Sequence, residues 1–436
     1  MAFTLGFHIL LACMGVAFPA ITLAANWWGL RKNDPVAIEL ARRWSKVMGV
    51  LFAVGAITGT VLSFEMGVLW PGLMSRFGDV FGVAFAIEGI FFFTEAIFLA
   101  IYIYGWDRLS PRAHLLSGIP VVVAGLGGAA AVVSANSWMN QPAGFDMDAA
   151  GRVTGVRPLE VLANGAAPYE IPHMILAAYM VAGFTVASIY AAGMLRGRTD
   201  RHHRLGFIIP FTVAAIATPL QLFVGDLAAR GIAGDQPAKF ASMEYVEKTG
   251  PNQPEIIGGI FSGGEVKYGI SIPNLDSLLV GFSPDTVVKG MEEFPAEDLP
   301  PSPTLLHLAF DAMVGIGTAL LGLAVWFAFV WWRRRELPRS RWFLRAAAGA
   351  GLAAALALEC GWIVTEVGRQ PFVVYGLLRT EDAVTTSGGI WFTFVGSLVL
   401  YASLAVITTL VLRRMARRWR EEGIEEHDVP YGPPVT

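Results

Sequence analysis

Long apolar stretches, separated by shorter polar ones, recur along this 436-residue chain from one end to the other. Each is about 18 residues or longer, the length that an α-helix needs to cross the hydrocarbon core of a bilayer. Only helices and closed barrels can cross lipid, and continuous apolar runs favour helices. The pattern therefore predicts an all-α integral membrane protein with nine transmembrane helices, at residues 5–29, 46–70, 81–105, 115–136, 172–195, 205–225, 304–332, 343–364 and 389–412.

Basic residues collect on alternate connections between these spans. The segments after the first, third, fifth, seventh and ninth spans hold 22 of the 32 Lys and Arg residues. Cytoplasmic loops carry such an excess of positive charge, so these segments define the cytoplasmic side. We therefore expect the N-terminus outside and residues 413–436 as a cytoplasmic tail, an arrangement that needs an odd number of spans.

Two of the expected outer loops are long. Residues 137–171 follow the fourth span, and residues 226–303 separate spans one to six (1–225) from spans seven to nine (304–412). The second loop is rich in Gly, Pro and acidic residues. A loop of this length is uncommon unless it is functional or disordered.

Composition agrees with a membrane protein and argues against two other classes. Hydrophobic residues make up 54% of the chain, charged residues only 15%, and the mean hydropathy is +0.54. A soluble globular protein carries about a quarter charged residues. The net charge of −3 gives no indication of nucleic-acid binding.

Polar and ionisable residues inside the spans gather near their outer ends. Such residues are costly in lipid and usually serve function. Glu88 and Glu95 are seven residues apart, which places both on one helix face about 10 Å apart along the axis, and Glu359 and Glu366 share this spacing. The whole layer comprises His8, Glu65, Glu88, Glu95, His173, His307, Asp311, Met313, Glu359 and Glu366.

This layer suits heme, because a porphyrin needs an apolar slot and its iron takes axial ligands from His or Met, less often from a carboxylate. The residue types alone leave an alternative open. A histidine at a helix end is usually an interfacial side chain, and a methionine usually fills a gap in the core. By that reasoning His307 borders the outer loop as an ordinary polar residue. We expect His114, His202, His203 and His427 to be plain loop residues on the cytoplasmic side.

Five sequence motifs resemble those of subunit I of the cytochrome bd ubiquinol oxidase family. They are "FAIEGIFFFTEAIFLAIYIYGWDRLS" (85–110), "SANSWMNQP" (134–142), "EIPHMILAAYM" (170–180), "LAFDAMVGIG" (308–317) and "LECGWIVTEVGRQPF" (358–372). The resemblance covers nearly the whole chain, in order, with nine spans and an outer loop after the sixth. It is specific as an ensemble.

The resemblance implies a set of heme-binding residues. His8 matches the N-terminal heme ligand of the active-site pair, and His173 and Met313 match the two axial ligands of the low-spin b heme. Glu366 matches a carboxylate that ligates or borders a heme of the active-site pair. Arg369 follows it, and a planar, permanently charged guanidinium can pair with heme propionates.

The resemblance also implies residues that act in proton and quinol chemistry. Glu88 and Glu95 match the acids beside the active-site hemes, which have roles in heme contact and proton delivery. Lys239 and Glu244, in "QPAKFASMEYVE", keep the five-residue spacing of a pair implicated in quinol oxidation. A Lys and a Glu at this spacing in a polar loop are also common as solvated surface charges, and that alternative stays open here.

The chain departs from the family pattern at several points. Asp311 stands where the family more often has an arginine, and Phe372 where it more often has a tryptophan. The interval from Glu88 to Glu95 is one residue shorter than usual, and the outer loop 226–303 is of the short type. These departures indicate a divergent branch and leave the third heme as either heme d or another b heme.

The resemblance implies a quinol:dioxygen oxidoreductase of the bacterial cytoplasmic (inner) membrane, which generates proton motive force without pumping. Its expected cofactors are a low-spin b heme, a high-spin b heme, and heme d or a third b heme. Its expected partners are quinol, dioxygen, membrane lipid and a second membrane subunit (subunit II of the oxidase), with room for a small single-helix subunit. Two alternatives belong to other classes: a b-heme membrane anchor that passes electrons between a dehydrogenase and quinone, and an ion or proton transporter that uses intramembrane carboxylates.

Overall fold

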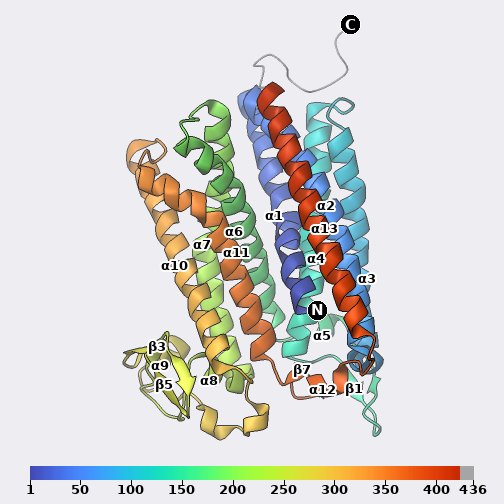
Figure 1. Cartoon of the computed structure of the whole chain (residues 1–436), viewed down its shortest axis with the longest axis vertical. Helices are drawn as coiled ribbons and strands as arrows, with labels where there is room; N and C mark the ends of the chain where they lie inside the picture. The colour runs from blue at the N-terminus through green and yellow to red at the C-terminus, as the bar shows by residue number, and fades with distance from the viewer. Residues whose placement is uncertain (423–436) are drawn as a thin grey trace.

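The predicted membrane helices are all present. The computed structural model describes residues 1–422, and within that range nine helices are long and apolar enough to cross a membrane. They stand roughly side by side as one bundle (Figure 1). Their bounds are Ala2–Lys32 (α1), Pro35–Leu69 (α2), Pro71–Tyr104 (α3), Pro111–Asn140 (α4), Ala167–Leu195 (α6), Arg201–Asp235 (α7), Pro303–Arg334 (α10), Arg341–Gly368 (α11) and Ile390–Glu422 (α13).

The helices extend beyond the apolar runs because local capping signals define their ends. Asp34 precedes Pro35, and its side chain accepts a hydrogen bond from the backbone N–H of Ala37. Ser110 precedes Pro111 and caps α4 in the same way. A capping oxygen satisfies an unpaired N–H of the first turn, and proline at the first helical position needs no partner for its nitrogen. The polar first turns of α2 and α4 are therefore helical.

The bundle consists of two groups of helices. Helices α1 to α4 pack on one another in one group, and α6, α7, α10 and α11 pack in the other. Contacts of α6 with α1 and α4 join the two groups, and α13 lies against α2. The largest cluster of buried apolar residues runs through both groups, so they share one core.

The long outer segments form ordered structure at one end of the bundle (Figure 1). The first holds a two-stranded sheet and a short helix, with bounds Asp146–Met147 (β1), Val153–Thr154 (β2) and Pro158–Leu162 (α5). The second holds Pro237–Met243 (α8), the strands Glu255–Ile257 (β3), Ile260–Ser262 (β4), Glu265–Lys267 (β5) and Ile270–Ile272 (β6), Leu275–Gly281 (α9), and 3-10 turns at Met291–Glu293 and Ala296–Asp298. After α11, a hairpin (β7, Phe372–Val374; β8, Leu378–Arg379) and Thr380–Ala383 (α12) lie at this same end.

Strands β3 to β6 make one bent antiparallel ribbon. Strand β3 pairs with β6, and β4 pairs with β5. Because β4 follows β3 and β6 follows β5 along the chain, the two pairs form one continuous hairpin with its turn between β4 and β5. The bend lies at Gly258 and Gly259, both with positive φ, a conformation that glycine adopts without steric cost. The bend faces α10, since the Gly258 N–H donates to Asp311 at 2.5 Å.

Candidate functional site

A cavity of about 430 Å³ lies between α6, α7, α10 and α11, at the end of the bundle that carries the long loops. Its wall is mainly apolar, and His173 of α6 and Met313 of α10 both line it. The volume is within the range of roughly 300–1,000 Å³ that is typical of small-molecule and cofactor pockets. The structure thus brings together the two side chains that were predicted to hold the low-spin heme.

Glycine residues leave space beside both predicted ligands. A methyl group added at Gly361 would lie 3.0 Å from Met313 Sδ, and one added at Gly225 would lie 3.3 Å from His173 Cε1. The Gln221 amide lies against the imidazole, with its Nε2 3.2 Å from His173 Nε2, and the oxygen of that amide is buried without a hydrogen-bond partner. An apolar slot with His and Met on separate helices fits an iron porphyrin.

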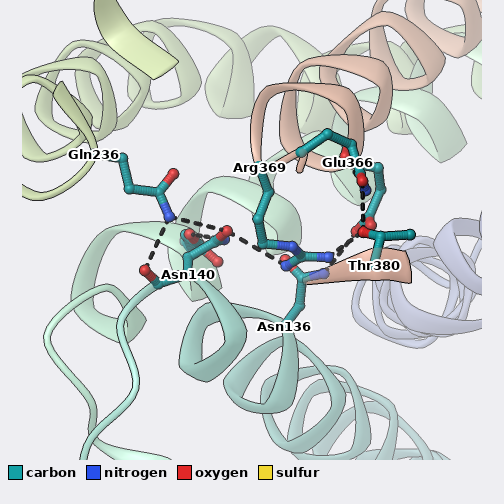
Figure 2. A network of polar contacts seen from close by, with 8 residues as sticks. Asn136, Asn140, Gln236, Glu366, Arg369 and Thr380 are labelled. Carbon is teal, nitrogen blue, oxygen red and sulfur yellow. Dashed lines mark hydrogen bonds and ion pairs between the residues drawn. The ribbon is translucent and has the colours of Figure 1, made fainter. Parts of the chain in front are cut away.

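The end of α11 carries a buried polar network beside the cavity, which Figure 2 shows. The Arg369 guanidinium donates to Glu366 Oε2 at 2.7 Å, and the Asn136 amide donates to Glu366 Oε1 at 2.9 Å. Arg369 also donates to the Asn140 side chain at 3.4 Å, and Gln236 donates to the backbone carbonyl of Asn140 at 2.9 Å. The network therefore joins α4, the end of α7 and the end of α11.

The end of α11 explains why these charges point inward. The helix stops at Gly368, Arg369 is only 3% exposed, and the chain turns into strand β7 after Pro371. Both oxygens of Glu366 accept hydrogen bonds, while Arg369 Nε is buried without a partner. Glu366 and Arg369, each predicted as a heme-binding residue, are thus in direct contact with each other, and one donor of the guanidinium remains available.

Lys239 of α8 is buried next to this network. It is 3% exposed, and its stem packs on Gly368, where a methyl group would lie 2.8 Å from Lys239 Cε. Burial lowers the pKa of Lys239 to about 8, while the charge of Glu170 acts in the opposite direction. Lys239 is therefore not a solvated surface charge.

Glu244 lies in a separate cluster of acids, although it is only five residues from Lys239. Its neighbours are Glu255 of β3, Asp276 of α9 and Asp311 of α10. Burial raises the pKa of Glu244 well above its ordinary value, and the charges of Glu255 and Asp276 add to the effect. Burial also raises the pKa of Glu255 and of Asp276 to about 7. Glu244, too, is buried rather than solvated, at 4% exposed.

The other predicted residues lie in the α1–α4 half of the bundle. His8 Nδ1 is 2.8 Å from Thr58 Oγ1 of α2, and the imidazole packs on Gly59. Glu95 borders a small space between α1, α2 and α3, and Glu88 is near enough to interact with it electrostatically. Asn136 links this half to Glu366 on α11. The nine predicted site residues therefore fall into several local groups rather than one.

Three histidine predictions were wrong about local structure. His114 is fully buried in the first turn of α4, where it stacks on Tyr102 with ring centroids 4.4 Å apart, because α4 begins at Pro111. His202 and His203 lie in the first turn of α7, which begins at Arg201. None of the three is a loop residue. His427 lies outside the described residues, as does most of the predicted tail 413–436. In the described part of that tail, α13 continues to Glu422.

His307 has a structural contact on each ring nitrogen. Its Nδ1 is 2.7 Å from the carbonyl oxygen of Met243, and its Nε2 is 3.0 Å from that of Gly258. The ring stacks on Tyr245 with centroids 3.9 Å apart and is fully buried. Together with Asp311, it fastens the outer ribbon and the end of α8 to α10.

Sequence reasoning missed several polar residues of the site. Asn136 and Asn140 are four residues apart near the end of the fourth span, a spacing that places both on one helix face and could have indicated a shared role. Glu170, which accepts from the Asn140 amide at 2.8 Å, stands in the motif "EIPHM" next to His173. No sequence pattern indicated a role for Glu255 or Asp276, because their position close to Glu244 depends on the folded outer loop.

Comparison with known proteins gives one consistent result. Residues 1–419 match the family model described as cytochrome bd terminal oxidase subunit I. A Bacillus subtilis protein named "Putative cytochrome bd menaquinol oxidase subunit I" is 36% identical over 94% of this chain and 93% of its own length. A second B. subtilis protein, cytochrome bd ubiquinol oxidase subunit 1, is 28% identical over 97% of this chain and 93% of its own length.

A solved structure agrees with these relatives. The chain superimposes on the bd oxidase from Geobacillus thermodenitrificans with a TM-score of 0.89 and 35% sequence identity, and 96% of each chain is covered. The similarity therefore extends over both halves of the bundle and the outer segments between them.

Proposed function

The chain belongs to the cytochrome bd terminal oxidase subunit I family, and we propose that it oxidises quinol at the loop end of its bundle and reduces dioxygen to water. It is thus a terminal quinol oxidase subunit, an oxidoreductase. Family membership favours this activity over the b-heme anchor and the ion transporter, the two alternatives that the sequence left open.

The observation that carries the proposal is the placement of His173 and Met313 in one mainly apolar cavity. In this proposal they would hold a low-spin b heme, and Gly225 and Gly361 leave space beside the two ligand side chains. His8 and Glu366 serve the active-site pair, a high-spin b heme and a heme d or third b heme. Bound heme supplies the redox chemistry, since its iron carries electrons between quinol and dioxygen.

Arg369 and Lys239 supply positive charge near these sites. Arg369 is held by Glu366 and Asn140 and keeps its Nε free of partners, so it can donate to a propionate without losing its present contacts. The burial of Lys239 places a second cation at the boundary between the cavity and the network. Both side chains are thus positioned before any ligand binds.

Quinol would dock between the outer loop and the cavity, where Lys239 and Glu244 lie on the same short segment. Glu244 is the candidate acceptor for a quinol proton, because burial raises its pKa and so makes its carboxylate a stronger base. On the dioxygen side, Glu88 and Glu95 would deliver protons along α3. Protons would be released outside and taken up from the cytoplasm, so charge separation requires no pump.

The proposal places the chain in the inner membrane of a bacterium, with the loop end outside and the C-terminal end in the cytoplasm. It also includes a second membrane subunit, subunit II of the oxidase. Large apolar side chains on α3 and α13 face outward, such as Phe93 at 67% and Phe392 at 86% exposure. These faces suit lipid or an apolar partner helix.

A single substitution, His173→Ala, tests the assignment. The purified complex should lose the low-spin heme band in a reduced-minus-oxidised spectrum and retain most high-spin absorbance, because the two sites use different helices. Quinol oxidation should fall by about 100-fold or more, since a metal ligand is lost. Absorbance spectroscopy and oxygen uptake with added quinol measure the two effects.

His203→Ala provides the matched control, because His203 lies in the first turn of α7, at the opposite end of the bundle. It should leave both the spectrum and the rate unchanged. A complete low-spin spectrum in His173→Ala would overturn the ligand assignment. A wild-type protein without heme absorbance, or without oxygen uptake on added quinol, would overturn the proposed function itself.

A further inference from the structure

Three carboxyl groups from separate segments meet at the loop end of the cavity. Glu244 follows α8, Glu255 lies in β3, Asp276 lies in α9, and all three line the cavity. Glu244 and Asp276 are 4% and 1% exposed, and each has one carboxyl oxygen, Oε2 and Oδ2 respectively, that is buried without a hydrogen-bond partner. Buried acceptors without partners are costly, so a structural role alone does not explain them.

The fold holds these acids in place from two directions. The bend of the ribbon is fixed to α10, because Gly258 donates its N–H to Asp311 and its carbonyl oxygen lies 3.0 Å from His307 Nε2. The Gln253 N–H donates to Ser277 Oγ at 2.9 Å, and the Ser277 N–H donates to the Gln253 carbonyl at 3.4 Å. Gln253 precedes the strand that holds Glu255, and Ser277 follows Asp276. The two hydrogen bonds therefore keep Glu255 and Asp276 at a fixed separation.

The acids differ in their access to solvent. Glu244 and Asp276 are buried, whereas Glu255 is half-buried. Glu244 and Glu255 are close enough for their charges to interact, and a carboxyl group that carries a proton can donate it to a carboxylate beside it. A proton taken up at the cavity wall therefore has a route through this contact towards the surface.

The charged environment favours protonation of the cluster near neutral pH. The groups that face it are Asp311 and His307 from α10, Asp226 and Arg230 from α7, and Lys239 from α8. Arg230 is paired with Asp226 at 2.9 Å, and the charge of Lys239 interacts with that of Glu170. Within residues 1–422, both nearby cations therefore interact with other acids. Burial raises the pKa of Glu255 and of Asp276 to about 7, and the charges of neighbouring acids add to the effect.

We propose that Glu255 and Asp276 form, with Glu244, a proton-collecting cluster that accepts the protons of quinol and passes them to the outer surface. This inference rests on the proposed quinol oxidase function and extends it to two further residues. Each quinol O–H bond breaks as a carboxyl O–H bond forms, and the proton leaves to water through Glu255. The two electrons of quinol go to an acceptor of the heme class, and quinone is released.

Asp276→Asn and Glu255→Gln test the proposal by removing a proton acceptor with little change in shape. In the holoenzyme each should lower kcat for quinol oxidation by about tenfold and leave KM and the heme spectrum unchanged. An acceptor must be deprotonated to act, so the wild-type rate should fall as pH drops below about 7. The charge of Asp276 raises the pKa of Glu244, so Asp276→Asn should move this acid limb to lower pH.

Infrared difference spectroscopy during a pH titration gives a readout that does not depend on turnover. The wild type should show a carboxyl C=O band that titrates near pH 7, and Asp276→Asn should lose part of it. Glu265→Gln is the matched control, because Glu265 is an exposed acid on β5 of the same ribbon; it should match the wild type in both experiments.

The outcomes separate this inference from the function on which it rests. Wild-type rates and pH profiles in both variants would overturn the cluster and leave the oxidase assignment intact. A reduced rate with an unchanged carboxyl titration would also overturn it. If Asp276→Asn does not fold, Glu255→Gln carries the same test, and a wild-type protein that does not oxidise quinol would instead overturn the proposed function.

Discussion

Single buried charges at the loop end of the bundle depend on a few neutral amide partners. Asn136 and Asn140 bond to Glu366, Glu170 and Arg369, so two amides fix three charged groups in place. Removal of the partner of a buried charge strongly destabilises the folded protein, whereas a solvated ion pair contributes little to its stability. Arg369 and Arg339 represent these two cases, with side chains 2% and 85% exposed.

We expect Arg369→Leu to destabilise the protein by about 3 kcal/mol, because Glu366 and Asn140 would lose a charged partner in a largely buried site. Arg369→Lys should recover part of this loss, since it keeps the charge but has a single donor group in place of the planar fork. Thermal unfolding of the purified protein in detergent measures the difference. Arg339→Leu, which removes an exposed pair with Glu336, should change stability by less than about 1 kcal/mol. Equal effects of the two Leu substitutions would contradict this account.

At the scale of elements, the outer ribbon is attached to α10 at two places: at the Gly258 bend, and at Phe261 of β4, whose N–H donates to Thr304 Oγ1 at 3.0 Å. His307 and Asp311 bind the Gly258 peptide on its carbonyl and N–H sides, and His307 also binds the carbonyl of Met243 at the end of α8. Asp311 is one of the positions where the chain departs from the family pattern. The structure gives it a role here, because an arginine could not accept the Gly258 N–H.

We therefore expect His307→Ala to loosen the ribbon at its Gly258 bend while the membrane helices stay folded. A neutral imidazole donates through one nitrogen, so one buried carbonyl group would lose its donor, at a cost of about 1–3 kcal/mol, and both carbonyls would lose their contact with the ring. Backbone amides of residues 255–272 should exchange hydrogen for deuterium about tenfold faster or more, and those of α6 and α7 should not change. Hydrogen exchange read by mass spectrometry tests this, with Lys267→Gln on the exposed β5 strand as the control. Unchanged exchange in the ribbon would show that other contacts hold it.

The elements also show which parts of the structure can be predicted from sequence. All nine membrane helices were predicted, because a run of apolar residues is a local property that lipid makes obligatory. Their ends were not: α7 continues to Asp235, ten residues past the predicted end at 225, because its last turns are polar and lie next to the outer loop. The pairing of His173 with Met313 was expected only through the family resemblance. The cluster of Glu244, Glu255 and Asp276 could not be predicted, since it depends on the tertiary placement of a ribbon and two short helices.

At the scale of the whole molecule, the arginine-rich connection and the proposed quinol site lie at opposite ends. The cavity and its acids are at the end that carries the ribbon, whereas the arginine-rich connection between α10 and α11 is at the other end (Figure 1). Positive residues collect on the cytoplasmic side of membrane proteins. The proposed quinol site should then face outward, which is the arrangement that separates charge without a pump.

This orientation can be tested with two cysteine substitutions at opposite ends of the molecule. Tyr268→Cys lies on the ribbon, where the native side chain is 90% exposed, and Arg339→Cys lies on the arginine-rich connection. The native Cys13 is buried and Cys360 half-buried, so both are first replaced by Ala. A membrane-impermeant maleimide added to spheroplasts should label Tyr268→Cys almost completely, and it should label Arg339→Cys only after the membrane is permeabilised. The opposite pattern would place the acid cluster in the cytoplasm. Quinol protons would then be released on the side from which dioxygen reduction draws them, and the proposed charge separation would disappear.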